Sequence, residues 1–252
     1  MECYTSSSGD RLPMLTFVPP HVAPKAGVLL FHGGALRSGS VENLAPQCRV
    51  LAAHGILAVS AGYRLLGQGA ESLADCVDDV RAAAAEFVTL AEGYGLGPSR
   101  LAIGGGSAGG HLALVAAMIS PDASVAYQGP DFGAIVTFNP VVDLLGFPPE
   151  GQRVVQESLG PGHDAVDFSP IHFVRRGNPS TVIFHGVEDR IVPVEQVRRF
   201  RDAMLAAGNE CLLVEFEGAE HGFYHDNPAA TPWFDLITSA SASFLLERLS
   251  SR

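Results

Sequence analysis

The sequence predicts an α/β protein, with a mainly parallel central sheet covered by helices on both faces, from three observations. Short apolar runs without polar alternation recur along the chain, as expected for strands buried on both faces. Stretches with helical spacing of apolar residues lie between these runs, and parallel strands need such crossover connections. The length of 252 residues fits one large domain of this class better than two ordinary ones.

Six apolar runs are the predicted core strands. In chain order they are 27–31 (GVLLF), 56–60 (ILAVS), 101–104 (LAIG), 134–138 (AIVTF), 181–184 (TVIF) and 211–216 (CLLVEF). In a parallel sheet, ligands bind at the carboxyl ends of the strands. The loops that follow these runs are therefore the places to look for chemistry.

Four segments are predicted helices: 72–93, 111–119, 194–207 and 234–248. The first has apolar residues at helical intervals around an alanine-rich middle and ends at a glycine. Segment 144–178 interrupts the alternation, because it is rich in Gly, Pro and polar residues and too long for an ordinary connection. We expect it to be a small cap inserted into a single domain that spans residues 1–252.

Composition and charge exclude several classes of protein. The chain is 47% hydrophobic and carries a net charge of -11, which disfavours binding to nucleic acid or to anionic membranes. No apolar stretch is long enough to span a membrane, and the first twenty residues lack a secretory signal, so a cytoplasmic location is expected. The scattered cysteines show no metal-like spacing and are expected to be reduced. A homo-oligomer remains open.

A strand-to-helix turn carries the strongest chemical signal. The pentapeptide from Gly105 to Gly109 (GGSAG) matches G-x-S-x-G between a predicted strand and a predicted helix. Such a turn forces Ser107 into a strained conformation that exposes its hydroxyl, and the residues two before and two after it must be small. Free N–H groups at the start of the following helix would stabilise an oxyanion there.

The same stretch also fits a rival pattern. Gly104, Gly106 and Gly109 spell G-x-G-x-x-G, the dinucleotide fingerprint. That fingerprint belongs on the first strand of a fold and needs an acidic residue at the end of the next strand. Here it lies in mid-chain, and residues 120–124 (SPDAS) are predicted to form a turn. The context therefore favours the nucleophile turn.

A serine hydroxyl needs a base to remove its proton. In enzymes that carry this turn, the acid and then the histidine follow the serine in the chain. His221 lies in the glycine-containing loop after the run 211–216 and is the candidate base, with His225 as the alternative. His111, one turn into the helix after the serine, and His185, at the end of a strand, are expected to have structural roles.

The acid is expected in the loop after the preceding core strand. Asp189 is our candidate there, and Glu188 beside it is a competitor. Either carboxylate could instead be a solvated loop residue or the N-cap of the helix that starts near Pro193. The ordered set of serine, acid and histidine on successive strand ends favours the catalytic interpretation.

A glycine-rich loop, His32-Gly33-Gly34-Ala35, follows the first buried strand. Its backbone N–H groups, together with that of Ala108, would face the negative charge that develops on an attacked carbonyl. The alternative is an ordinary glycine turn, which is common after strands. The position at the end of a core strand, at the same edge as the nucleophile turn, favours a function.

Together these motifs resemble the hormone-sensitive-lipase-like and feruloyl/acetyl-esterase-like (BD-FAE-like) branch of the α/β-hydrolase superfamily. The resemblance extends from residue 27 to about 223 and rests on these motifs: His32 to Ala35, Gly62-Tyr63-Arg64-Leu65, Asp79-Val80-Arg81-Ala82-Ala83, Gly104 to His111, Asn139-Pro140-Val141-Val142-Asp143, His185-Gly186 with Asp189, and Gly218 to Phe223.

The resemblance implies the α/β-hydrolase fold and a serine ester hydrolase that needs neither metal nor cofactor. It implies three catalytic residues and three oxyanion donors, namely Ser107 as nucleophile, His221 as base, Asp189 as its orienting acid, and Gly34, Ala35 and Ala108 as donors. The expected partner is a small-molecule ester, with small to medium acyl groups.

The chain departs from the family at two points. Ala35 stands where the family usually has a third glycine, and its N–H is expected to remain a donor if the backbone there has negative φ. The N-terminus is short for a two-helix cap, which suggests an open, shallow site for small or water-soluble esters.

Alternatives for the function are an acyltransferase, a lactonase or a peptidase with the same triad, and a non-catalytic receptor on this fold. The substrate-binding residues stay unknown at this stage. Most of the large side chains near the site are expected to pack in the core or cap rather than line a pocket, namely Leu144, Leu145, Phe147, Phe223, Tyr224 and Trp233.

Overall fold

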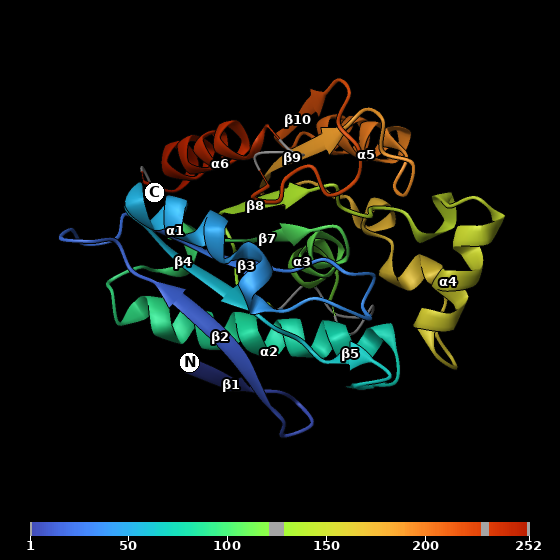
Figure 1. The fold of residues 1–252 in the computed structure, drawn as a ribbon, viewed down its shortest axis with the longest axis horizontal. Coiled ribbons are helices and arrows are strands. Elements are labelled where there is room, and N and C mark those ends of the chain that lie inside the picture. Colours follow the sequence, from blue (N-terminus) through green and yellow to red (C-terminus); the bar gives the residue numbers. More distant parts are fainter. Residues whose placement is uncertain (1, 121–128, 228–231, 251–252) are drawn as a thin grey trace.

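A computed structural model describes residues 2–120, 129–227 and 232–250 (Figure 1). In this part of the chain the central sheet has the strand order β1-β2-β4-β3-β7-β8-β9-β10. The strands are β1 (Glu2–Thr5), β2 (Arg11–Phe17), β3 (Ala26–Phe31), β4 (Ile56–Ala61), β7 (Leu101–Gly106), β8 (Ala134–Phe138), β9 (Ser180–Gly186) and β10 (Cys211–Phe216). A separate short pair joins β5 (Leu65–Leu66) to β6 (Gly69–Ala70).

The six predicted runs are the parallel part of this sheet, from β4 and β3 to β10. Every residue of β3, β4, β7 and β8 is buried, which explains the absence of polar alternation in the sequence. The antiparallel strands β1 and β2 form one edge of the sheet and were not predicted. Most residues of these two strands are exposed or half-buried, and β2 contains Pro13. The two strands therefore lack a continuous apolar run.

Helices cover both faces of the sheet (Figure 1). Alternate residues of β3 separate the two cores: Leu29 and Phe31 pack with α2, α3 and α5, whereas Val28 and Leu30 pack with α1 and α6. The helices are α1 (Ala45–Ala53), α2 (Leu73–Glu92), α3 (Ala108–Met118), α4 (Pro149–Leu159), α5 (Val194–Ala206) and α6 (Phe234–Leu249), with short 3-10 turns η1 (Val41–Leu44) and η2 (Pro98–Arg100).

The predicted helix boundaries agree with the structure except at α3. The helix α2 begins after Ser72, whose side chain accepts from the N–H of Asp75 in a capping box. The helix α3 begins at Ala108, directly after the nucleophile turn and three residues before the predicted start at His111. The glycines of its first turn conceal the start, because glycine is a poor helix former. Close packing requires both of them: a Cβ on Gly109 would meet the carbonyl of Phe31 in β3, and a Cβ on Gly110 that of Gly105 in β7.

The predicted cap at 144–178 contains the helix α4 and the 3-10 turns η3 (Leu144–Gly146), η4 (Ala165–Phe168) and η5 (Pro170–Phe173). Figure 1 shows α4 beyond the ends of the strands to which the arrowheads point. The sequence did not predict α4, because only Val155, Ser158 and Leu159 of this helix are buried. The turn predicted at 120–124 falls, from 121 on, outside the described residues.

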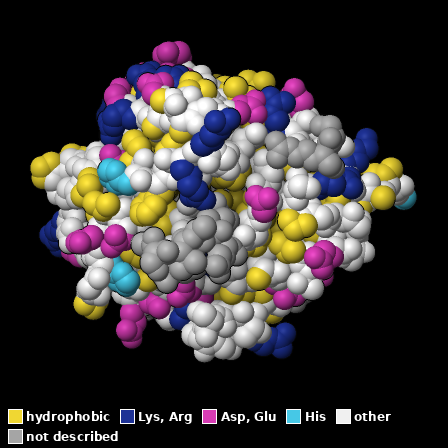
Figure 2. Space-filling model, turned by 180° about the vertical axis from the view of Figure 1, so that it is seen from behind, with side chains coloured by type: hydrophobic (Ala, Val, Ile, Leu, Met, Phe, Trp, Pro, Cys, Tyr) yellow, Lys and Arg dark blue, Asp and Glu magenta, His cyan; other side chains and the backbone are white. Residues whose placement is uncertain are grey.

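No helix within the described ranges is long and apolar enough to cross a bilayer. Figure 2 shows the molecule from behind, with basic and acidic side chains interspersed over the described part of that face.

Candidate active site

The turn between β7 and α3 holds Ser107 at φ 51° and ψ -118°. This is a strained conformation for a residue with a side chain, at a cost of about 1–3 kcal/mol. The flanking glycines are required by space: a Cβ on Gly105 would lie 2.3 Å from the carbonyl oxygen of Phe31 and 2.8 Å from the carbonyl carbon of Gly109. A Cβ on Gly109 would lie 2.1 Å from the same oxygen of Phe31.

Three side chains from separate strand ends form one hydrogen-bonded chain. His221 Nε2 lies 2.8 Å from Ser107 Oγ, and His221 Nδ1 lies 2.8 Å from Asp189 Oδ2. A carboxylate can only accept, so Nδ1 carries the proton and Nε2 is free to accept the proton of the serine hydroxyl. Ser107 follows β7, Asp189 follows β9 and His221 follows β10, and the carboxyl ends of these parallel strands lie at one edge of the sheet.

The carboxylate of Asp189 is buried and well satisfied, with 5% of the residue exposed. Its Oδ1 accepts the backbone N–H groups of Ile191 and Val192, each at 2.9 Å. Its Oδ2 accepts from Asn139 Nδ2 at 2.6 Å as well as from His221. Burial by itself raises the pKa of Asp189, but the hydrogen bond and charge of His221 and the N–H of Val192 more than offset this, so the pKa is lowered. The group is ionised at neutral pH.

The competing carboxylate, Glu188, is exposed, and its backbone N–H donates to the carbonyl of Ala219. His185, just before it in the chain, is buried, and its Nε2–H donates to the carbonyl of Val192 at 2.9 Å. That contact closes the loop that presents Asp189, so His185 has a structural role, as predicted.

The other two candidate histidines have other contacts in the structure. His111 is buried, and its Nδ1–H donates to the carbonyl of Val141 at 3.0 Å. Burial lowers the pKa of His111 to about 4, so the ring is neutral at physiological pH. The ring of His225 lies against the ring of Tyr224, with centroids 4.4 Å apart.

Asn139 is a site residue that the sequence analysis did not single out. It follows β8, is fully buried, and has φ 45°. Its side chain donates to Asp189 and its backbone N–H donates to the carbonyl of Phe184. A polar residue at the carboxyl end of a core strand, directly before Pro140, was the signal that could have identified it.

The loop after β3 passes beside the nucleophile, because a Cβ on Gly33 would lie 3.1 Å from Ser107 Cβ. The condition of negative φ at Ala35, under which its N–H was expected to remain a donor, is not met: φ is 116° at Gly34, 52° at Ala35 and 63° at Leu36. Left-handed backbone costs a residue with a side chain about 1–2 kcal/mol. The substitution of alanine for glycine therefore leaves a strained loop, in which the backbone N–H of Ala35 is retained.

A cavity of about 460 Å³ opens beside the serine and is mainly apolar. Its walls come from the loops after β3 and β8, from α2, from the nucleophile turn and α3, from the cap and from the loop after Asp189. They are formed by Ala35, Leu36, Leu73, Ser107, Ala108, His111, Val141, Leu144, Phe147, Pro148, Glu150, Gly151, Val154, Val155, Ser158, Arg190, Ile191 and Val192. A volume of this size is within the range of about 300–1,000 Å³ for ligand pockets. The open, shallow site for small or water-soluble esters stays a prediction from the sequence.

The large side chains considered from the sequence divide between cavity and core. Leu144 and Phe147 line the cavity, whereas Leu145 is 51% exposed. Phe223 and Tyr224 are buried in the core between β8, β9 and α6. Trp233 is half-buried and packs against this core.

Comparison with known proteins decides the family. The BD-FAE family model matches residues 17–204. The chain belongs to the BD-FAE family. The fold of this BD-FAE protein is the α/β-hydrolase fold, and it is similar to that of esterase 2 from Thermogutta terrifontis. The structure of that esterase phosphonylated by sarin has a TM-score of 0.87 and 32% sequence identity over 98% of this chain and 94% of that one.

Two further similarities support the family. The propionate-bound structure of the Thermogutta terrifontis esterase has a TM-score of 0.84 and 33% identity over 98% of this chain and 93% of that one. Esterase LipC of Mycobacterium tuberculosis is 30% identical over 230 residues, which are 84% of this BD-FAE chain and 53% of LipC. The chain spans about half the length of the curated relatives it matches first.

Proposed function

We propose that this BD-FAE protein is a serine esterase that hydrolyses carboxylic esters through Ser107, His221 and Asp189. The observation that carries the proposal is the continuous hydrogen-bonded chain from Ser107 Oγ through His221 to Asp189, with both links at 2.8 Å. A nucleophile, a base and an orienting acid in this arrangement are the parts that acyl transfer requires.

In the proposed mechanism, Ser107 Oγ attacks the ester carbonyl carbon while its proton passes to His221 Nε2. The carbonyl oxygen becomes an oxyanion, and the N–H groups of Gly34, Ala35 and Ala108 are the proposed donors to it. The tetrahedral intermediate collapses with cleavage of the bond to the alcohol oxygen, which takes the proton from Nε2. Water then attacks the acyl-enzyme with the same base, and the carboxylic acid leaves.

The cavity orients the substrate in this proposal. The departing alcohol must lie beside His221, which gives it a proton. Ser107 and Ala108 line the cavity, but His221 is not part of its described wall. The cavity is therefore assigned to the acyl group, and its apolar wall favours small to medium acyl chains. A structure of the similar Thermogutta terrifontis esterase has propionate bound, which supports a short acyl group.

The rival functions differ in what leaves or attacks. An acyltransferase, lactonase or peptidase would use the same three side chains, and product analysis with added alcohols or amines separates them from a hydrolase. A non-catalytic receptor has no need of the complete hydrogen-bonded chain, which supports an enzyme. The small-molecule ester partner and the cytoplasmic location stay predictions from the sequence. The sequence leaves the oligomeric state open.

The proposal is tested by comparing two serine variants on p-nitrophenyl butyrate. Ser107→Ala is expected to lower kcat by at least about a thousandfold. Ser60→Ala is the control, because Ser60 is buried and its hydroxyl donates to the carbonyl of Val41 at 2.7 Å, away from the site. Retention of most of the activity in Ser107→Ala would reject the proposed function.

A further inference from the structure

The segment that follows β4 contacts both ends of the loop that carries two of the proposed oxyanion donors. At the first end, Tyr63 Oη donates to the carbonyl of His32 at 2.9 Å, and the two rings stack with centroids 4.5 Å apart. At the second end, the N–H of Leu66 donates to the carbonyl of Leu36 at 2.8 Å. Both proposed donors of this loop lie in the chain between these two contacts.

The loop between these two contacts has a strained backbone, so neighbouring groups must hold it in place. Three successive residues, Gly34, Ala35 and Leu36, have left-handed φ values, and two of them carry side chains. Strained backbone of this kind persists only where neighbouring groups fix it. The direction of the N–H groups in the loop therefore depends on the bonds at its ends.

Tyr63 is suited to be such a fixed point. It is 4% exposed, and burial raises the pKa of its hydroxyl well above the ordinary value, so the hydroxyl keeps its proton and can donate. Tyr63 is not part of the described wall of the cavity. Any effect of its hydroxyl on the reaction must act through the loop.

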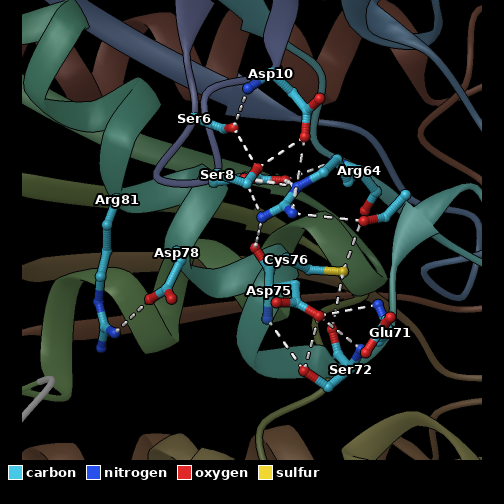
Figure 3. Close-up of polar contacts among 12 residues, drawn as sticks. Ser6, Ser8, Asp10, Arg64, Glu71, Ser72, Asp75, Cys76, Asp78 and Arg81 are labelled. Atoms are coloured by element: carbon cyan, nitrogen blue, oxygen red, sulfur yellow. Dashed lines mark hydrogen bonds and ion pairs between the residues drawn. The ribbon is translucent and has the colours of Figure 1, made fainter.

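The next residue anchors this segment to α2. Arg64 Nε and Nη2 each lie 2.8 Å from a carboxylate oxygen of Asp79, and the backbone N–H of Arg64 donates to Asp79 Oδ2 at 2.9 Å. The thiol of Cys76 donates to the carbonyl of Arg64 at 3.2 Å. The side chain of Asp79 is fully buried and that of Arg64 is 9% exposed. Figure 3 shows Arg64 among polar side chains of the turn between β1 and β2 and of the start of α2.

We propose that Tyr63 is a positioning residue for the oxyanion loop, and that the Arg64–Asp79 pair holds Tyr63 in place. The hydroxyl of Tyr63 fixes the carbonyl of His32 and so directs the N–H groups of Gly34 and Ala35 toward the oxyanion. The proposal rests on the proposed function, because it needs an oxyanion at Ser107. Since that charge is absent from the bound ester and develops in the transition state and the tetrahedral intermediate, a misplaced loop lowers kcat and leaves KM nearly unchanged.

The test compares two buried tyrosines, each of which donates to a backbone carbonyl. Tyr63→Phe keeps the ring and removes the bond to His32. Tyr4→Phe is the matched control, because Tyr4 Oη donates to the carbonyl of Gly62 at 2.8 Å and makes no such bond to the loop. For p-nitrophenyl butyrate we expect Tyr63→Phe to lower kcat by about tenfold with KM within about twofold, and Tyr4→Phe to stay within about twofold in both.

A second measurement separates positioning from a general loss of structure. A trifluoromethyl ketone adds to the serine and places an oxyanion in the site, whereas the corresponding methyl ketone binds as an uncharged carbonyl. Tyr63→Phe is expected to weaken inhibition by the trifluoromethyl ketone by about the same tenfold as kcat, and to leave inhibition by the methyl ketone unchanged. Titration with a fluorophosphonate corrects both values for inactive protein. Arg64→Lys, which loses the bidentate contact with Asp79, is expected to show the same selective loss.

The proposal is overturned if kcat of Tyr63→Phe stays within about twofold of the wild type, or if the two tyrosine variants lose kcat equally. Ser107→Ala, measured in the same assay, distinguishes failure of the positioning role from failure of the proposed function. Its inactivity together with a normal Tyr63→Phe rejects the positioning role alone. Ester hydrolysis that survives in Ser107→Ala rejects the proposed function and the positioning role with it.

Discussion

The two sides of the candidate site are held by different physical means. On the acid–base side, the ionised, buried carboxylate of Asp189 accepts side-chain hydrogen bonds from His221 and Asn139, which fix its position and that of the imidazole. On the oxyanion side, Gly34 and Ala35 sit in left-handed backbone that is held at its ends by hydrogen bonds to carbonyls. The first side depends on particular chemical groups, and the second on backbone shape. Substitutions on the two sides should therefore have effects of different size and kind.

The largest effect is expected on the acid–base side. Asp189→Asn removes the negative charge and replaces an acceptor with an amide that can donate to His221, which favours the wrong tautomer of the imidazole. We expect kcat to fall by about 10³–10⁴-fold with KM little changed. Glu188→Gln is the matched control on the adjacent residue, and its kcat should equal that of the wild type. Equal losses in the two variants would show that the structure assigns the wrong carboxylate.

The next effect is on stability and involves the buried imidazole of His111. Burial lowers its pKa to about 4, below its unfolded value of about 6.5. Between these values the unfolded chain binds more protons, so stability falls as the pH decreases from 6.5 toward 4. The loss attributable to His111 approaches about 3 kcal/mol.

Urea unfolding of His111→Leu at a series of pH values checks this effect. The variant should show a flatter decline of the free energy of unfolding between pH 6.5 and 4 than the wild type. His54→Gln, a change at an exposed histidine, is the control and should keep the wild-type decline. An unchanged decline in His111→Leu would contradict the neutral, buried imidazole.

A smaller effect is expected on the acyl cavity. Val155 of α4 is buried and lines the cavity, so Val155→Phe should fill part of it. We expect kcat/KM for p-nitrophenyl octanoate to fall by about tenfold relative to the acetate, since the bulk removes space for methylenes. Val166→Phe is the control, because Val166 is a 43% exposed cap residue outside the described cavity wall. A loss shared equally by all chain lengths would contradict the acyl assignment.

The smallest effect is expected at the strained alanine of the oxyanion side. Ala35→Gly relieves left-handed strain at φ 52° and should raise the free energy of unfolding by at most about 1 kcal/mol, with kcat within about threefold. Ala35→Val places a β-branched residue at the same φ and should lower both stability and kcat. Thermal unfolding and initial rates measure the two variants together. Stabilisation by valine would contradict the strained backbone.

Features of the fold and the site that contacts within a short segment determine could be predicted from the sequence. The nucleophile turn was predictable because its two glycines are forced by contacts below 3 Å, so the motif carries its own geometry. The order of serine, acid and histidine on strand ends predicted Asp189 and His221, which form one hydrogen-bonded chain with Ser107 in the structure. Contacts between distant segments were not predictable in this way. The bonds from Asn139 to Asp189 and from Tyr63 to His32 join segments 50 and 31 residues apart.

Two other outcomes show the limits of local pattern. The positive φ at Ala35 contradicts the general preference of alanine, because the contacts at the ends of the loop override it. The helix α4 was missed because its stretch of sequence starts with Pro149, Glu150 and Gly151, is polar on average, and buries only Val155, Ser158 and Leu159. At Ala35 tertiary contacts decide the conformation, and a single sequence does not display them.

The central claim is that the hydroxyl of Ser107 is activated by its contact with His221. Peptide mapping by mass spectrometry after brief reaction with a fluorophosphonate tests it most directly. One adduct per chain, located on Ser107, absent in Ser107→Ala and formed far more slowly in Asp189→Asn, is the predicted result. Labelling at another residue, or labelling of Ser107 at the same rate in Asp189→Asn, would contradict the account.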